Sequence, residues 1–253
     1  MKIGIKNIAI LYLLSFLLLS SCVDKEQNDG KVDVKFVLKY NNQPLEMLKD
    51  YEYPDGKSVM FNKFSFFISN LSFVGANGET TSEGVKMVNF TNVNSTQSGA
   101  LLGTTVRLEG LKTGEYQSFN ICLGVPPAEN AKTPADFGTT SDLSFTGEYW
   151  PGWKSYIFSK TEGFIDIDGD GTKEQGFALH TGSDEAFKCL NANHSITIGK
   201  EAQPLEIEID LVKLFGDAPY YDIKSNPQIH SLSQKPQVLA LSENLAKCFI
   251  IRN

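Results

Sequence analysis

One segment of the sequence spaces its carboxylates as a hard-cation site would. GFIDIDGDGTKEQGFALH, from Gly163 to His180, places three aspartates at alternate positions ahead of a glycine. This spacing matches positions 1, 3, 5 and 6 of a calcium loop, whose oxygen atoms fold inward around one ion. Positions 7 and 9 can add a backbone carbonyl and a further carboxylate. The candidate calcium ligands are Asp166, Asp168, Asp170, Thr172 and Glu174.

The same segment departs from a complete EF-hand loop. Position 12 is Phe177 instead of a bidentate glutamate, and the flanking residues alternate like strands instead of helices. A tight turn without an ion is the alternative, because aspartate and glycine favour turns by themselves. In either case we expect the loop to brace the fold, since it carries no nucleophile and no acid–base pair.

The elements that must position such residues are predicted to be β-strands. Val32–Tyr40 alternates apolar and polar residues, and Lys63–Val74 is rich in aromatic residues and ends in the hairpin signal GANGE. Further strands are predicted at TTVRLEG, YQSFNICLGVP, SYIFSKTEGFIDI, HSITIG and PLEIEIDL. Short helices are predicted at DLVKLFG and at SENLAKCFI, where Ser242 is a candidate N-cap. The fold class is therefore all-β, an antiparallel β-sandwich with one or two short helices.

The N-terminus predicts export and lipid attachment. Lys2 and Lys6 precede an apolar run that is too short to span a bilayer, which is typical of a signal peptide. The run ends in LLSSC, which resembles a bacterial lipobox whose cysteine, Cys22, would be acylated. We therefore expect a signal peptide at 1–21, a lipidated tether at 22–31 and one domain at 32–253. The predicted location is the cell envelope, as an outer-membrane lipoprotein that faces the periplasm or the cell surface.

Composition excludes some partners. The predicted leader holds two of the 23 basic residues and no acidic residue, which leaves 21 basic against 30 acidic residues and a charge of −9. Such a chain is a poor match to nucleic acid, whose affinity comes largely from Lys and Arg. Cys122, Cys189 and Cys248 could form one disulfide in three ways, and the sequence alone does not choose among them.

The chain after Val32 carries, in order, the segments KFSFFISNLSFV, FNICLGVPPAEN, GEYWPGWKSYIFSKTEG, GFALHTG, IDLVKLF and a late IHS, which together span nearly all of it. In this order the segments resemble the MbnP-like copper-binding family, whose relatives include MopE and CorA and whose Bacteroidetes members are often lipoproteins. The resemblance implies a β-sandwich, which agrees with the alternation of the predicted strands.

The resemblance also implies a copper site. In characterised relatives two histidines and an oxidised tryptophan hold copper(I), and a dihaem peroxidase-like partner makes that oxidation in some systems. His180, in ALHTG, and His230, in QIHS, take the place of the two histidines, while His194 matches no family position. Trp150 and Trp153, in WPGW, are the aromatic residues that would be modified or would line the site.

The predicted function is therefore copper capture, buffering or delivery by a lipid-anchored envelope protein. The alternative is a surface lipoprotein that binds a protein or a carbohydrate without copper. An enzyme is not expected, because no Gly-x-Ser-x-Gly, His-Glu-x-x-His or phosphate-loop motif occurs.

Overall fold

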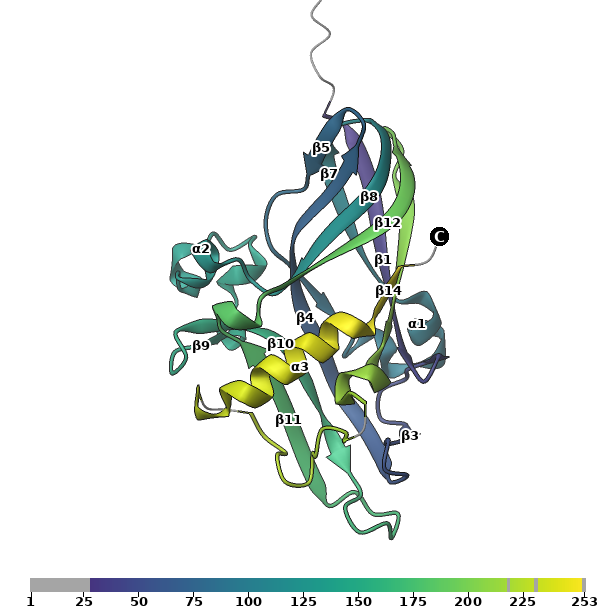
Figure 1. Ribbon diagram of the computed structural model, residues 1–253, viewed down its shortest axis with the longest axis vertical. Coiled ribbons are helices and arrows are strands. Elements are labelled where there is room, and N and C mark those ends of the chain that lie inside the picture. The colour runs from purple at the N-terminus through teal and green to yellow at the C-terminus, as the bar shows by residue number, and fades with distance from the viewer. Residues whose placement is uncertain (1–27, 218, 230–231, 252–253) are drawn as a thin grey trace, which may run out of the picture.

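The computed structural model describes residues 28–217, 219–229 and 232–251 (Figure 1). Its strands form two sheets with a few short helices, so the predicted β-sandwich is confirmed. The predicted signal peptide, Cys22 and His230 lie outside the described residues. Within those residues, no helix has the length and apolar character needed to cross a membrane.

The smaller sheet is centred on β1, which alternates buried apolar residues with half-buried polar ones. β13 pairs with β1 in parallel, unlike the antiparallel pairing that we predicted. A parallel pair needs a long crossover, and here the chain builds the second sheet before it returns. The strands of this sheet are β1 (Gly30–Tyr40), β2 (Gln43–Pro44), β7 (Thr104–Leu111), β13 (Gln203–Asp210) and β14 (Phe249–Ile251).

The larger sheet has the strand order β11-β10-β4-β8-β12, and the long strand β4 also pairs with three short strands (Figure 1). β11 and β12 therefore stand at the two ends of this order. The strands are β3 (Asp50–Glu52), β4 (Ser58–Gly75), β5 (Gly78–Thr81), β6 (Lys86–Asn89), β8 (Gly114–Leu123), β9 (Tyr149–Trp150), β10 (Ser155–Ile165), β11 (Gln175–Gly182) and β12 (Lys188–Ile198).

Aromatic side chains fill the space between the sheets. Phe36 of β1 meets Phe66 of β4 edge to face, with ring centroids 6.0 Å apart. Phe61 of β4 stacks on Phe215, which follows β13. Such rings supply most of the buried apolar area of a core. The inner face of β4 therefore packs against the smaller sheet. Its other face carries polar residues and is covered by loops.

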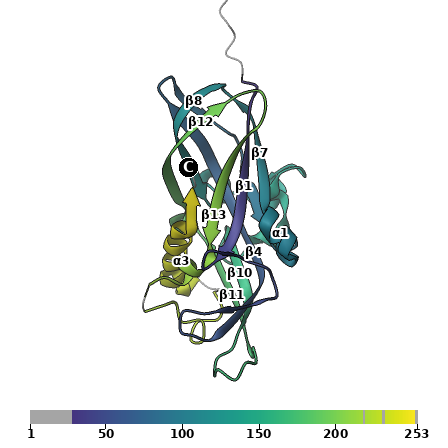
Figure 2. The same cartoon turned by 90° about the vertical axis from the view of Figure 1, so that its right-hand side faces the viewer.

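The helices lie outside the sheets, and α1 and α3 occupy opposite sides of them (Figure 2). We predicted that the last helix begins after Ser242, which was wrong. α3 begins at Lys235, with Pro236 in its first turn, and Ser242 is buried in mid-helix, where its hydroxyl donates to the Val238 carbonyl. The α-helices are α1 (Gln97–Leu102), α2 (Pro127–Asn130) and α3 (Lys235–Cys248). Short 3₁₀ helices are Val93–Ser95, Pro134–Asp136, Asp142–Ser144, Thr146–Glu148, Asp184–Ala186, Leu211–Phe215 and Leu232–Gln234.

The structure selects one of the three possible disulfides. Cys122 and Cys189 face each other across β8 and β12 and are bonded. Cys248, at the end of α3, is buried and free, and burial raises the pKa of its thiol well above the ordinary range. The bond therefore joins neighbouring strands of the larger sheet.

Candidate metal centre

The predicted ligands described by the structure lie on one hairpin, formed by β10 and β11. The two strands pair antiparallel, so that Lys160 stands opposite His180 and Glu162 stands opposite Ala178. Side chains at alternate positions of a strand share a face. Lys160, Glu162 and His180 therefore project from the same face of the sheet, although our reading of the sequence singled out His180 alone.

A turn brings the two tryptophans together beside that face. β9 pairs with the start of β10, and the backbone N–H of Trp153 donates to the backbone carbonyl of Trp150 to close the turn. Proline is favoured at the second position of such a turn, which Pro151 occupies. The two indoles stack with centroids 4.8 Å apart and an angle of 7° between their planes. The WPGW motif therefore forms a turn that stacks its two indole rings on each other.

The aromatic pair lies directly against β11. The Trp150 ring meets the His180 ring edge to face, with centroids 6.3 Å apart. Trp153 covers Gly182, where an added Cβ would come within 3.2 Å of the indole and within 2.7 Å of the Tyr156 carbonyl oxygen. Glycine at position 182 thus lets the indole approach the strand. The structure brings together His180, Trp150 and Trp153, as one site would require.

His180 is held by a carboxylate. The His180 side chain is 11% exposed, and Nε2 lies 2.9 Å from Oε1 of Glu162. Lys63 of β4 pairs with the same carboxylate at 3.2 Å. The hydrogen bond with His180, opposed by burial and assisted by Lys63, lowers the pKa of Glu162 to about 2. Glu162 is therefore a carboxylate anion that links the histidine to the neighbouring strands.

A second ion pair borders the same face. The Lys160 ammonium donates to the Gly147 carbonyl at 2.7 Å and pairs with Glu148 at 2.8 Å. Both side chains are mostly buried, because the 3₁₀ turn Thr146–Glu148, which leads into β9 and carries Glu148, packs against Lys160. The surroundings of His180 thus contain two lysines and two glutamates whose charges balance.

The second predicted copper ligand, His230, lies outside the described residues, but the chain just before it is described. Gln228 forms a parallel bridge with Ala178 of β11. The Ala178 N–H donates to the Pro227 carbonyl at 2.8 Å, and the Ile229 N–H donates to the Ala178 carbonyl at 3.0 Å. Ala178 precedes His180 by two positions, and Gln228 precedes His230 by two positions. Two segments that are 50 positions apart in the sequence therefore run side by side ahead of the two histidines.

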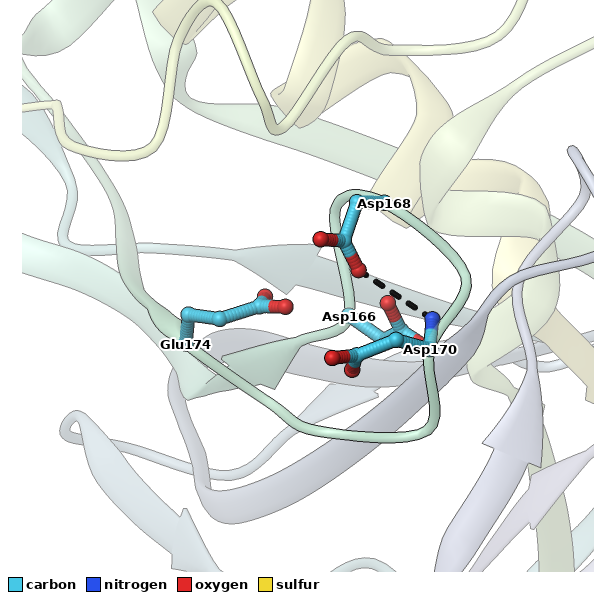
Figure 3. Close-up of side chains that lie close together, drawn as sticks. All are labelled: Asp166, Asp168, Asp170 and Glu174. Atoms are coloured by element: carbon cyan, nitrogen blue, oxygen red, sulfur yellow. Dashed lines mark hydrogen bonds between the residues drawn. The ribbon is translucent and has the colours of Figure 1, made fainter.

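The aspartate loop occupies the tip of the same hairpin, between β10 and β11 (Figure 3). Asp166, Asp168, Asp170 and Glu174 can each place one carboxylate oxygen so that all four lie within 4.8 Å of one another. Backbone N–H groups organise the loop: Asp168 accepts from Asp170, and Asp170 accepts from Thr172. The sequence therefore predicted correctly which acidic residues gather there.

Asp166 is the buried member of this cluster and its organising residue. It accepts backbone N–H groups from Gly169 at 2.6 Å and from Gly171 at 2.9 Å. Burial raises the pKa of its carboxyl, but these donors outweigh burial and hold the pKa below its usual value. The loop is thus built around a charged aspartate, while the other three carboxylates remain exposed.

Sequence reasoning missed Glu162, Lys160, Lys63 and Glu148. One signal was present: a lysine and a glutamate stand at alternate positions, 160 and 162, of the strand that was predicted at SYIFSKTEGFIDI. Charged residues in such a strand must face a partner or solvent. Their partners could not be named, because the register of three strands and the path of a long loop decide them.

Comparison with known proteins gives one family and one related fold. A family model described as MbnP matches residues 29–231. The solved structure of MbnP from Methylosinus trichosporium aligns with a TM-score of 0.51 at 12% identity, over 76% of this chain and 79% of that one. At this identity the likeness shows the fold alone. No curated protein matches the chain.

Proposed function

The chain belongs to the MbnP family, and from this premise we propose that it binds copper in the cell envelope for capture, buffering or delivery. The proposed mechanism is coordination, without a catalysed reaction. The proposal includes kinship with MopE and CorA and a place among Bacteroidetes lipoproteins. It also includes lipid attachment at Cys22 and an outer-membrane location, with the sandwich held at the membrane by its lipid.

The observation that carries the proposal is the surroundings of His180. An almost fully buried imidazole lies between a carboxylate and a stacked pair of indoles, at the edge of a sheet. Imidazole nitrogen suits copper, and a site with few ligands favours the reduced ion. The donor and its setting therefore fit copper(I).

We propose His230 as the second ligand. The support is the bridge between Ala178 and Gln228, which joins the chain ahead of one histidine to the chain ahead of the other. Two imidazoles from such neighbouring segments would supply a two-nitrogen donor set. This assignment needs no ligand from β12, at the other end of the sheet, where His194 lies.

Trp150 and Trp153 line the proposed site, and one of them could be oxidised as in relatives of the family. Trp150 is the better candidate, because its ring is the one in contact with His180. A dihaem peroxidase-like protein is the partner that such an oxidation would require. Mass spectrometry of the protein from its native host tests this part, since an unmodified mass at both tryptophans contradicts it.

We propose calcium for the aspartate loop, in a bracing role. Four carboxylates with oxygens within 4.8 Å of one another offer the hard ligands that calcium prefers. The loop joins β10 to β11, and β11 carries His180, so an ordered loop would help to hold the hairpin that presents the copper ligand.

Copper(I) titration against a competing chelator tests the copper proposal. We expect tight binding by the wild-type protein and a loss of at least about 100-fold in His180→Ala and in His230→Ala, since each removes one of two strong donors. His194→Ala is the matched control and should bind like the wild type. Weak binding that none of the three substitutions changes would contradict the proposal and favour a protein- or carbohydrate-binding module instead.

A further inference from the structure

We propose that Glu162 is a positioning residue of this site, which accepts the Nε2–H of His180 and thereby leaves Nδ1 as the atom that binds the metal. The proposal rests on the proposed function, because it assigns a role within the same copper site. It adds a residue that lies 18 positions away in the sequence and that itself donates nothing to the metal.

The geometry of the pair supports this role. The 2.9 Å between Nε2 and Oε1 is a hydrogen-bond distance, and the histidine ring is nearly buried. Both residues belong to regular strands whose register fixes their backbones, because Glu162 stands opposite Ala178 and diagonal to His180. Neither side chain needs a loop to hold it, so the bond is a built part of the hairpin.

The carboxylate is held in turn by Lys63. Their separation is 3.2 Å, and the two residues face each other across β10 and β4. A chain of contacts therefore runs from the third strand of the sheet order through Glu162 to the histidine on its edge strand. This arrangement limits rotation of the Glu162 side chain and keeps its oxygen directed at Nε2.

The chemistry of imidazole connects this geometry to metal binding. A neutral ring has one N–H and one lone pair, and the hydrogen bond at one nitrogen decides which nitrogen is free to bind a metal. A carboxylate that accepts the N–H also makes the opposite nitrogen a better donor, and loss of such a partner typically lowers metal affinity 10- to 100-fold. Glu162 can act in this way on His180.

The structure offers a matched comparison in Glu148. This glutamate borders the same site and is also mostly buried, but it pairs with Lys160 and not with His180. Substitution by glutamine removes one negative charge in either case. A general effect of charge near the copper would therefore appear in both variants, whereas a positioning effect would appear only at Glu162.

Copper(I) competition measurements on Glu162→Ala, Glu162→Gln and Glu148→Gln test the proposal. We expect the affinity to fall about 10- to 100-fold for alanine and less for glutamine, whose amide oxygen still accepts a hydrogen bond. Glu148→Gln should stay within about threefold of the wild type, and thermal melting would verify that each variant folds. Wild-type affinity in Glu162→Ala would overturn the positioning role, while a wild-type protein without copper affinity would overturn the proposed function itself.

A second measurement needs no copper. Nitrogen-15 NMR of the metal-free protein, at an alkaline pH where imidazole is neutral, reports which ring nitrogen carries the proton. We expect the Nε2–H tautomer of His180 in the wild type and a mixture of tautomers in Glu162→Ala. A wild-type ring protonated only on Nδ1 would overturn the proposal, whatever the copper affinity.

Discussion

The β10–β11 hairpin carries two candidate metal sites that are built in opposite ways. At its tip, four carboxylates from a stretch of nine residues gather around one point and three of them are exposed. On its face, His180 is buried among residues drawn from β4, β9 and β10. The first site depends on a local loop, whereas the second depends on the pairing of strands and on the segment that covers them.

This difference predicts different sensitivities. A local loop keeps its shape through its own backbone hydrogen bonds, so distant substitutions should leave it intact. The histidine site includes a contact between Lys63 and Glu162 that spans 99 positions of sequence, so a change in packing should disturb it. Each of the following predictions tests how one of the two regions is built.

The largest effect is expected from Trp153→Ala. Trp153 is 8% exposed, stacks on Trp150 and covers Gly182, and removal of such a side chain typically costs about 3–5 kcal/mol of stability. Urea denaturation would measure the loss. Trp153→Phe is the control, because it keeps a ring in place and removes an indole N–H that has no partner among the described residues. A loss below about 1 kcal/mol in the alanine variant would contradict the packing role of the pair.

How far each site can be predicted from sequence follows from the same difference. The gathering of the four carboxylates was predictable, because their spacing in the sequence alone brings them together. Glu162 was not, because its meeting with His180 depends on the register of β10 against β11. His180 itself was identified through a family resemblance and not through its spacing.

The fold shows the same limit. Alternation predicted β1 correctly, since the side chains of Val32, Val34 and Phe36 all face the core. Nothing local indicated that β1 pairs in parallel with β13, because the partner residues lie about 170 positions away. The start of α3 was missed for another reason: Ser242 can cap a helix, but it can also satisfy its hydroxyl within one.

The next largest change in stability is expected when calcium is added, through the aspartate loop at the tip of the hairpin. If calcium binds the loop, 100-fold more calcium than the dissociation constant stabilises the fold by about 2.7 kcal/mol, or roughly 5–10 °C in melting temperature. Asp168→Asn should reduce this shift, because it removes an exposed carboxylate while its amide oxygen can still accept the Asp170 N–H. Asp55→Asn, which alters an exposed carboxylate outside the cluster, should leave the shift unchanged. Equal melting temperatures with calcium and with a chelator would identify the loop as a turn without an ion.

The smallest change in stability is expected from substitution of two glutamates, Glu162 and Glu185, whose carboxyls both have a lowered pKa. The hydrogen bond with His180, together with Lys63, lowers the pKa of Glu162 to about 2, and hydrogen bonds from Lys235 and the backbone lower that of Glu185 to about 2 as well. A carboxyl whose pKa is lower in the folded than in the unfolded protein stabilises the fold at pH values above the unfolded pKa, which is near 4.5 for glutamate. This stabilisation is lost as the pH falls toward 2. The two sites differ in exposure, since the Glu162 side chain is 23% exposed and that of Glu185 is 53% exposed.

Because solvent screens an exposed ion pair, equal pKa values should not mean equal stabilisation. We expect Glu162→Gln to cost roughly 1–2 kcal/mol at neutral pH and Glu185→Gln less than about 0.5 kcal/mol. Urea denaturation at several pH values between 7 and 2 would show the Glu162→Gln deficit shrinking below about pH 4.5 and vanishing near pH 2. Each variant removes one negative charge, so a general effect of net charge would shift both stability curves alike. A deficit of the same size at both positions would mean that Glu162 is an ordinary surface ion pair, and the face of the hairpin would then resemble its tip in depending on exposed charges.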